Sequence, residues 1–239
     1  PDAYLSTVEA LRHAGVACET QVDISWVNSE LLETDDPEKV IGDVHGIIVP
    51  GGFGCRGVEG KIVAARYARE NNVPFFGLCL GLQCAVVEYA RSVLGLKNAN
   101  TTECDPDTPH PIVRRLPGQE GVEELGGTMR LGALPCKVMP GSIAEAAYGS
   151  DIIYERHRHR FEINTSYKDM LDASGMVTTA MSLDSRHIEI VELKGHPWFL
   201  GTQFHPEFKS RPNRPHPLFS QFMQAILKQA GFNQEILGI

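Results

Sequence analysis

A cysteine lies between a predicted buried strand and a predicted helix, in the sequence Gly77-Leu78-Cys79-Leu80-Gly81. This Gly-x-Cys-x-Gly pattern copies the nucleophile elbow, in which glycines flank a tight turn because side chains there would clash with the neighbouring strand and helix. The turn would lift the sulfur to the carboxyl edge of the sheet, and the helix N-terminus favours a thiolate. Cys79 is therefore a candidate nucleophile; the alternative is a buried structural cysteine.

A cysteine nucleophile needs a base, and Phe204-His205-Pro206-Glu207-Phe208 follows a predicted apolar strand. A histidine directly after a strand reaches the same sheet edge as Cys79. Glu207 could hold the imidazole in one tautomer, which is the third role in a Cys-His-acid triad. Only the fold can bring His205 to Cys79, because the two are far apart in sequence. The remaining histidines are interpreted as surface or structural residues.

A glycine-rich turn, Pro50-Gly51-Gly52-Phe53-Gly54, follows another predicted strand. Consecutive glycines let backbone N–H groups point into a site, as an oxyanion hole requires. A phosphate loop is the rival interpretation, but the Lys-Ser/Thr of a P-loop and the glycine order of a dinucleotide fingerprint are both missing. A plain tight turn is the third alternative.

Arginine and histidine alternate in Arg156-His157-Arg158-His159-Arg160. In a strand the three arginines would share one face and the two histidines the other. A metal site would need thiol or carboxylate ligands, and no cysteine is near in sequence. We therefore expect an anion site in which one arginine pairs with a carboxylate. The alternative is a solvated edge strand.

The elements around these residues alternate between strands and helices, which is typical of a parallel α/β sheet. Helices are predicted at residues 2–14, 58–71, 80–94, 167–174 and 217–230, and a short helix is predicted to start at residue 36. Strands are predicted at residues 16–27, 46–50, 73–78, 187–193 and 198–204. Residues 98–127 are expected to form long loops, and residues 128–195 short strands and turns around one helix. We expect one domain over residues 1–239 with a loop-rich insertion.

Composition narrows the function classes. The chain has 239 residues, 42% of them hydrophobic, with a formal net charge of −8, which disfavours nucleic acid and anionic membrane surfaces as partners. No apolar run approaches the ~20 residues that span a bilayer, and a signal peptide is not expected. None of the 6 cysteines forms a Cys-x-x-Cys pair, so reduced thiols in a cytoplasmic protein are expected, with a structural zinc site as the alternative. The first residues do not resemble a native start, so we expect an excised domain.

These motifs together resemble the class I, triad-type glutamine amidotransferases, and more closely the C-terminal glutaminase domains of the CTP synthase family. The resembling segments are residues 51–61, 77–83, 126–132, 155–160, 203–208, 211–212 and 216–219. They extend over nearly all of the chain. The resemblance implies an open, mostly parallel sheet with helices on both faces and a small antiparallel insertion.

The resemblance also implies a reaction. Cys79 would attack the side-chain amide of L-glutamine and form a γ-glutamyl thioester. The backbone N–H groups of Gly52 and Leu80 would hold the oxyanion. His205, oriented by Glu207, would protonate the departing ammonia and then activate water.

Further glutamine contacts follow from family position. They are Gly81, Leu82, Gln83, Glu103 and Arg160. The chemistry agrees, because Glu103 suits the α-ammonium group and Arg160 suits the α-carboxylate.

No metal or cofactor is implied for this domain. The ammonia would pass to a synthetase domain absent from this chain, which would aminate UTP with ATP and Mg²⁺, and GTP would be the allosteric activator. The full-length enzyme is expected to be a homo-oligomer.

Residues 126–132, which include Arg130, are expected to form a mobile lid that responds to GTP; the alternative is a glycine-rich hairpin.

Two other functions remain open. A stand-alone hydrolase of the same fold could act on another γ-glutamyl amide, although residues 126–132 and 156–160 count against it. The other alternative is a catalytically silent regulatory or assembly module. The presence of Cys79, His205 and Glu207 counts against it, because such a module would not need them.

Overall fold

The computed structural model describes residues 2–116 and 129–232 and contains a main sheet of seven strands. In spatial order the strands are β1 (Ile47–Val49), β2 (Phe75–Leu78), β10 (Phe199–Thr202), β9 (Ile188–Leu193), β8 (Met176–Ser182), β5 (Arg130–Val138) and β6 (Ile152–His159). The predicted open α/β sheet is confirmed, and the predicted strands at residues 46–50, 73–78, 187–193 and 198–204 all form.

The sheet has a parallel part and an antiparallel part. β1 and β10 both pair with β2 in parallel, so that Ile48 and Leu200 lie on either side of Phe76. The pairings from β10 through β9, β8 and β5 to β6 are antiparallel. The predicted dominance of parallel pairing therefore holds for the strands that lead into the motifs and not for the rest of the sheet.

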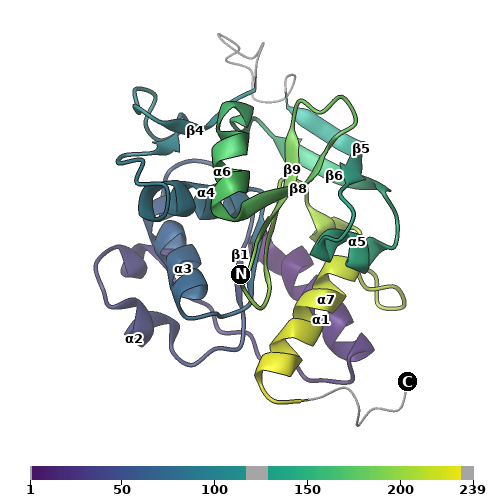
Figure 1. The fold of residues 1–239 in the computed structure, drawn as a ribbon. Helices are drawn as coiled ribbons and strands as arrows, with labels where there is room; N and C mark the ends of the chain where they lie inside the picture. Colours follow the sequence, from purple (N-terminus) through teal and green to yellow (C-terminus); the bar gives the residue numbers. More distant parts are fainter. Residues whose placement is uncertain (1, 117–128, 233–239) are drawn as a thin grey trace.

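Helices cover both faces of this sheet, as predicted (Figure 1). One layer contains α3 (Val58–Glu70), α4 (Leu80–Ser92) and α6 (Lys168–Ser174), and the other contains α1 (Leu5–Ala17), α5 (Ile143–Tyr148) and α7 (Pro217–Gln229). Successive side chains of a strand point to opposite faces. Phe75 accordingly stacks on Phe199 in the first core, while Phe76 meets Phe219 in the second.

Local sequence explains the ends of the two short helices α2 and α5. α2 (Pro37–Ile41) begins at Asp36, whose side chain accepts a hydrogen bond from the Glu38 N–H. α5 is a second helix in a region for which only one was predicted. It begins at Ser142, which caps the Glu145 N–H, and ends at Gly149 with φ of 63°. Six residues between two caps were too short for a periodic pattern to reveal them. The 3₁₀ turns are η1 (Asp2–Tyr4), η2 (Ser29–Glu33), η3 (Thr165–Tyr167) and η4 (Pro206–Phe208).

A second, smaller sheet lies within the predicted insertion. It contains β3 (Asn100–Thr101), β4 (Pro111–Arg115) and β7 (Phe161–Ile163), with β4 antiparallel to β7 and parallel to β3. The strands β3 and β4 lie within residues 98–127, for which long loops were predicted, so that prediction is wrong there. The antiparallel pairing of β4 with β7 is the small antiparallel insertion that the resemblance implied. Each strand has at most five residues, which leaves little alternation to read in the sequence.

The predicted strand at residues 16–27 is wrong. Helix α1 continues to Ala17, and residues 18–28 have no regular structure. They line a groove of about 980 Å³, and β1 lines it as well. A strand needs a neighbouring backbone for its hydrogen bonds. Val22 and Ile24 alternate as a strand would and line this groove together with β1, but neither has a ladder partner among residues 2–116 and 129–232.

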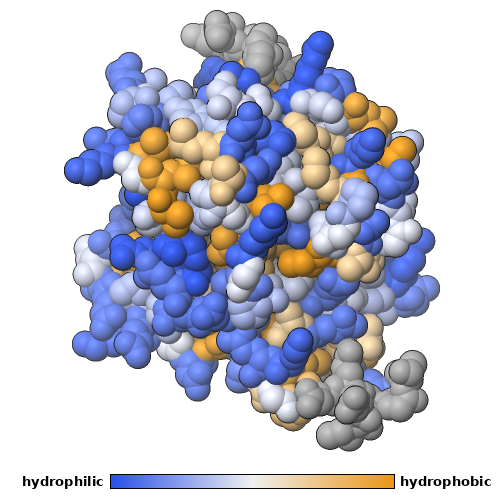
Figure 2. All heavy atoms as spheres, in the orientation of Figure 1, coloured by the Kyte–Doolittle hydropathy of each residue, from blue (hydrophilic) through white to orange (hydrophobic). Residues whose placement is uncertain are grey.

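The surface fits the acidic composition. Figure 2 shows hydrophilic side chains over most of the face drawn, with apolar side chains in small separate groups. Within residues 2–116 and 129–232, no helix has the length and apolar character needed to cross a membrane.

Candidate active site

Cys79 lies at the turn from β2 into α4 and has a strained backbone. Its φ of 51° and ψ of −99° place it in a region that side chains rarely adopt. Its N–H donates to the Thr202 carbonyl at 2.7 Å, which ties the turn to β10. The side chain is buried, with 3% exposed. This is the geometry that the nucleophile-elbow pattern predicts.

The two glycines of the elbow are required by close backbone approach. A Cβ on Gly81 would lie 2.0 Å from the Val49 carbonyl oxygen, and a Cβ on Gly77 would lie 2.7 Å from the Gly81 carbonyl carbon. Both distances are impossible for real atoms. The prediction that side chains would clash here is confirmed.

His205 and Glu207 meet Cys79 at the same sheet edge. Because β10 is parallel to β2 and adjacent to it, the residues that follow the two strands lie side by side. The η4 turn brings Glu207 back so that its Oε1 lies 2.7 Å from His205 Nδ1. A Cβ on Gly51 would lie 2.7 Å from His205 Cε1 and 3.5 Å from the Cys79 Cβ. Gly51 therefore packs against both residues, and no other residue type would fit.

The electrostatics of His205 follow from these neighbours. Burial alone would lower its pKa, but hydrogen bonds and charges from Cys79 and Glu207 outweigh burial and raise the pKa to about 10. The imidazole is thus protonated at neutral pH beside the sulfur. A base positioned beside a cysteine sulfur is the arrangement that covalent catalysis by a cysteine uses.

Gln203 is a site residue that sequence reasoning missed. Its Nε2 donates to Cys79 Sγ at 3.6 Å, and its Oε1 lies 3.3 Å from Gln83 Nε2. Gln83 also donates to the Phe161 carbonyl at 2.9 Å, so the two amides form a buried chain that ends at the sulfur. Its position could have indicated a role in the site, because Gln203 directly follows β10 and lies two residues before His205.

The glycine-rich turn after β1 lies next to the first turn of α4. A Cβ on Gly52 would lie 3.2 Å from Leu80 Cδ2, so the two predicted oxyanion donors are neighbours. Leu82 is fully buried, and its side chain packs against Gly201. Any contact of Leu82 or Gly81 with a ligand in this site would therefore involve the backbone.

Glu103 faces the same turn. Its Oε1 accepts a hydrogen bond from the Gly54 N–H at 2.9 Å. The residues that follow each partner, Cys55 and Cys104, form a disulfide. The prediction that all six cysteines are reduced thiols is therefore wrong for this pair. Their separation of 49 residues in sequence concealed a Cα–Cα distance of 5.3 Å.

Strand β6 carries the arginine–histidine alternation as predicted. Arg156 and Arg158 are exposed, whereas His157 and His159 are buried. Burial, together with the charge of His157, lowers the pKa of His159 to about 3. Arg160 follows the strand and is half-buried, and its carbonyl accepts from the Leu116 N–H at 2.9 Å.

A buried ionic cluster, formed by Arg130, His157 and Glu189, joins β5, β6 and β9. Glu189 lies 2.7 Å from Arg130 Nη1 and 2.8 Å from His157 Nε2. Cys136 lies close enough to complete a potential metal ligand set, contrary to the expectation that no cysteine is near. However, Glu189 is already paired, and burial raises the pKa of Cys136, which opposes the thiolate a metal requires.

The predicted lid is only partly covered by the structure. Residues 126–128 lie outside the described residues. Arg130 and Gly132 are part of β5 and pair with His159 and His157 of β6. The Arg130 guanidinium pairs with the Glu189 carboxylate.

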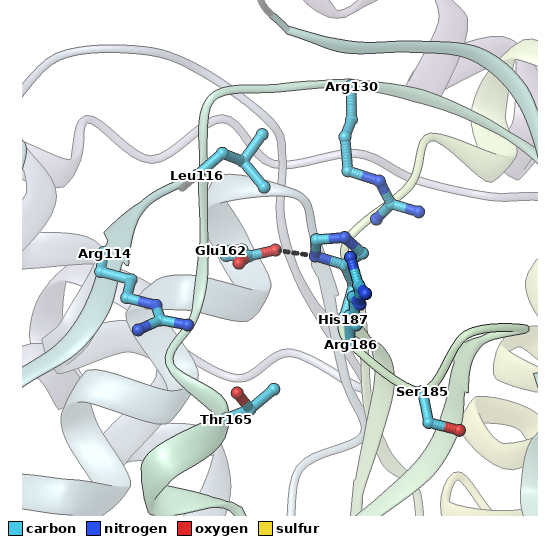
Figure 3. A pocket seen from close by; sticks show the side chains of 8 residues that line it. All are labelled: Arg114, Leu116, Arg130, Glu162, Thr165, Ser185, Arg186 and His187. Carbon is cyan, nitrogen blue, oxygen red and sulfur yellow. Dashed lines mark hydrogen bonds and ion pairs between the residues drawn. The ribbon is translucent and has the colours of Figure 1, made fainter. Parts of the chain in front are cut away.

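A separate cavity of about 520 Å³ contains none of the predicted site residues (Figure 3). Arg114 and Arg130 extend toward it from opposite sides, and His187 bonds Glu162 between them. Since Arg130 is paired with Glu189 and His187 with Glu162, most of the charge around this cavity is already compensated.

The chain is similar to several known proteins. The family model for class-I glutamine amidotransferases matches residues 1–225. CTP synthases of Carboxydothermus hydrogenoformans and Moorella thermoacetica are 61% and 60% identical over 95% and 97% of this chain. The chain spans 43% of the length of each of these two relatives. The glutaminase domain of Trypanosoma brucei CTP synthase, solved with bound acivicin, has a TM-score of 0.88 at 39% identity, covering 95% of this chain and 89% of that one.

Proposed function

Since the chain belongs to the class-I glutamine amidotransferase family, among the glutaminase domains of CTP synthases, we propose that it hydrolyses L-glutamine through Cys79. The observation that carries the proposal is the placement of His205, held by Glu207 at 2.7 Å, beside a cysteine on a strained elbow. A thiolate and an imidazolium in contact are the reactants that amide hydrolysis by covalent catalysis needs.

The first half of the reaction forms a thioester. The Cys79 sulfur attacks the γ-amide carbon, and the backbone N–H groups of Gly52 and Leu80 stabilise the negative oxygen. Gln203 donates to the sulfur and helps to hold it in place. As the C–N bond breaks, His205 gives its proton to the nitrogen, and ammonia leaves.

The second half restores the enzyme. His205, now neutral, takes a proton from water, and the resulting hydroxide attacks the thioester carbon. The C–S bond breaks, glutamate leaves, and the thiolate–imidazolium pair is formed again. Glu207 holds the imidazole in the same orientation in both halves.

Charge and position support the substrate assignment. Glu103 presents a carboxylate for the α-ammonium group, and Arg160 offers a bidentate partner for the α-carboxylate. Gln83, which is buried and hydrogen-bonded to Gln203, is proposed as a further glutamine contact. The backbones of Gly81 and Leu82 complete the proposed glutamine contacts.

The wider role is inferred from the relatives. The ammonia passes to a synthetase domain, where it aminates UTP to CTP in a reaction that uses ATP and Mg²⁺, with GTP as activator. We infer no metal or cofactor in this domain itself, a homo-oligomeric full-length enzyme, and a cytoplasmic location.

The test is ammonia and glutamate release from L-glutamine by the chain, compared with the Cys79→Ala variant. Removal of a nucleophile of this kind lowers kcat by about 10⁴-fold or more. The matched control is Cys84→Ala, because Cys84 is fully buried in α4 and burial raises its pKa to about 12. Equal activity of wild type and Cys79→Ala would exclude the proposal. Faster hydrolysis of another γ-glutamyl amide would favour the stand-alone hydrolase, and no activity in the full-length enzyme would favour the silent module.

A further inference from the structure

The Cys55–Cys104 disulfide joins two loops that both reach the proposed glutamine site. Cys55 ends the turn after β1 that contains Gly51 and Gly52, and Cys104 lies in the loop after β3. The Cys55 residue is exposed and Cys104 is half-buried. A thiol reductant can therefore reach this bond, unlike the buried Cys79, Cys84 and Cys136.

The disulfide lies directly beside Glu103. The Glu103 carboxylate accepts from the Gly54 N–H at 2.9 Å, and the next residue in each loop is a cysteine of the bond. The same two loops are therefore joined twice: by the hydrogen bond between Glu103 and Gly54, and by the disulfide between the residues that follow them. Opening the covalent bond leaves the hydrogen bond as the link between Glu103 and the turn.

Within its own loop, Glu103 is held by short-range contacts. Its N–H donates to Thr101 Oγ1 at 3.2 Å, and the Cys104 N–H donates to the Thr101 carbonyl at 3.1 Å. These bonds set the local turn but do not fix its distance from Gly54. The cross-link therefore controls where the Glu103 carboxylate lies relative to the rest of the site.

The catalytic groups do not depend on this bond in the same way. Gly51 packs against His205 and Cys79, and Gly52 packs against Leu80. Cys79 and His205 are held by β2 and β10. Opening the disulfide should therefore change the position of Glu103 more than that of the nucleophile or the oxyanion donors.

We propose that Cys55 and Cys104 are a redox modification site that sets the affinity for glutamine, an inference that rests on the proposed function. A dithiol reductant supplies two electrons and two protons: the S–S bond breaks, two thiols form, and the reductant becomes a disulfide. A low-molecular-weight disulfide reverses the exchange. The oxidised form holds Glu103 ready for the α-ammonium group, and the reduced form loses part of that preorganisation.

The experiment measures KM and kcat for L-glutamine on oxidised protein and on protein kept in a dithiol reductant, with peptide mapping of each state. Reduction should raise KM about 5-fold, the lower end of typical coupling between sites, while kcat changes little. Cys104→Ser should match the reduced wild type in both buffers. Cys18→Ser is the matched control, because Cys18 is a free thiol at the end of α1, and it should respond to reductant as wild type does.

A second readout uses the rate at which Cys79 is alkylated. A chloroketone derived from glutamine needs the α-ammonium contact, whereas iodoacetamide does not. Reduction should slow the first reaction about 5-fold and leave the second unchanged. This measurement needs no variant, so it holds even if Cys104→Ser does not fold.

The outcomes separate the two proposals. Equal KM values in both states, with the disulfide mapped in the oxidised one, overturn the redox site alone. Free Cys55 and Cys104 thiols in an oxidising buffer overturn it as well. No hydrolysis and no reaction of Cys79 with the chloroketone in either state overturn the proposed function itself.

Discussion

The parallel and antiparallel parts of the main sheet bury different kinds of side chain. Around β2 and β10 the buried groups are large and apolar, as with Phe75, Phe76 and Phe199. Across β9, β5 and β6 the buried groups include ionisable side chains, among them Glu189 and His157. Both parts exclude water, but only in the second do buried ionisable side chains lie within the strands themselves.

Because of this difference, we expect the parallel part to contribute mainly to catalysis and the buried polar groups of the antiparallel part to contribute mainly to stability. In the parallel part, apolar burial holds the strands, and the polar atoms of Cys79 and His205 stand at the strand ends. In the antiparallel part, buried polar groups are paired with one another, as when Glu192 accepts from the N–H groups of Ile143 and Ala144. Changes at the strand ends should therefore alter kinetics, and changes in the buried ionic cluster should alter stability.

The largest effect is expected for Glu189→Ala. It leaves Arg130 and His157 without their carboxylate, and breaking a buried ion pair in this way lowers the free energy of unfolding by about 3–5 kcal/mol. Urea denaturation measures the loss, and kcat per folded molecule should not change. Glu9→Ala is the control, because 43% of the Glu9 side chain is exposed in its pair with Arg12, and loss of this surface pair should cost less than about 1 kcal/mol.

The pH dependence of stability should differ between Glu189→Ala and wild type. Burial would raise the pKa of Glu189, but the hydrogen bond from His157 and the Arg130 charge outweigh it, and the pKa is lowered from 4.5. The stability from this group is present above pH 4.5 and is lost as pH falls through the lowered pKa. Wild type should therefore lose more stability on acidification than Glu189→Ala. A kinetic defect with unchanged stability would contradict the comparison.

The next effect is expected for Glu207→Gln at the catalytic end. Loss of the carboxylate that orients His205 should lower kcat by about 10²-fold, within the usual range for acid–base groups. It also removes one cause of the raised pKa of His205, so the alkaline limb of the activity profile should move to lower pH. The control is Glu70→Gln, since Glu70 is exposed on α3.

Stability gives a second readout for His205. Its pKa is raised from 6.5 to about 10, so the stability it contributes is complete below pH 6.5 and is lost as pH rises through about 10. Glu207→Gln should weaken this alkaline loss. An unchanged activity profile together with unchanged kcat would remove Glu207 from the proposed mechanism.

Arg160→Lys should have a smaller effect and one confined to binding. A lysine cannot reproduce a bidentate contact with the α-carboxylate. We expect KM to rise about 10-fold, which corresponds to about 1.4 kcal/mol, with little change in kcat. Arg158→Lys is the matched control, because Arg158 is exposed on β6 over the Phe53 ring. A wild-type KM for Arg160→Lys together with a raised KM for Arg158→Lys would transfer the contact to Arg158.

The smallest effect is expected for Tyr148→Phe. Its hydroxyl donates to Glu155 at 3.1 Å and lies 3.3 Å from His216 Nε2, on the antiparallel side of the molecule. Loss of this hydroxyl should reduce stability by about 1 kcal/mol and leave both kinetic constants unchanged. Thermal unfolding measures the difference. A change in kcat would show that the two parts of the sheet are coupled.

The sequence predicted the parts of the site that depend on short-range patterns. The elbow at Cys79, the glycine-rich turn and the His205–Glu207 pair each lie within a few residues, and each follows a strand with an apolar run. Parallel neighbouring strands then place all three at one edge. The family resemblance added Glu103, which local pattern alone did not indicate, and it selected Arg160 among the three arginines that the strand pattern had offered.

The features that the sequence did not predict depend on distant contacts. The Cys55–Cys104 bond and the Gln203–Cys79 contact join residues 49 and 124 positions apart. The buried ionic cluster likewise draws on β5, β6 and β9. The failed strand at residues 16–27 has the same cause, because alternation in sequence does not supply a neighbouring backbone.

The positive φ of Cys79 bears on how such a site persists through evolution. A non-glycine residue in this conformation destabilises the fold by about 1–3 kcal/mol, and glycine would relieve most of that strain. Selection for a more stable protein would thus favour Cys79→Gly, which has no nucleophile. The cysteine survives at this position only under continuous selection for its chemistry, and a lineage that no longer used that chemistry would gain stability by losing it.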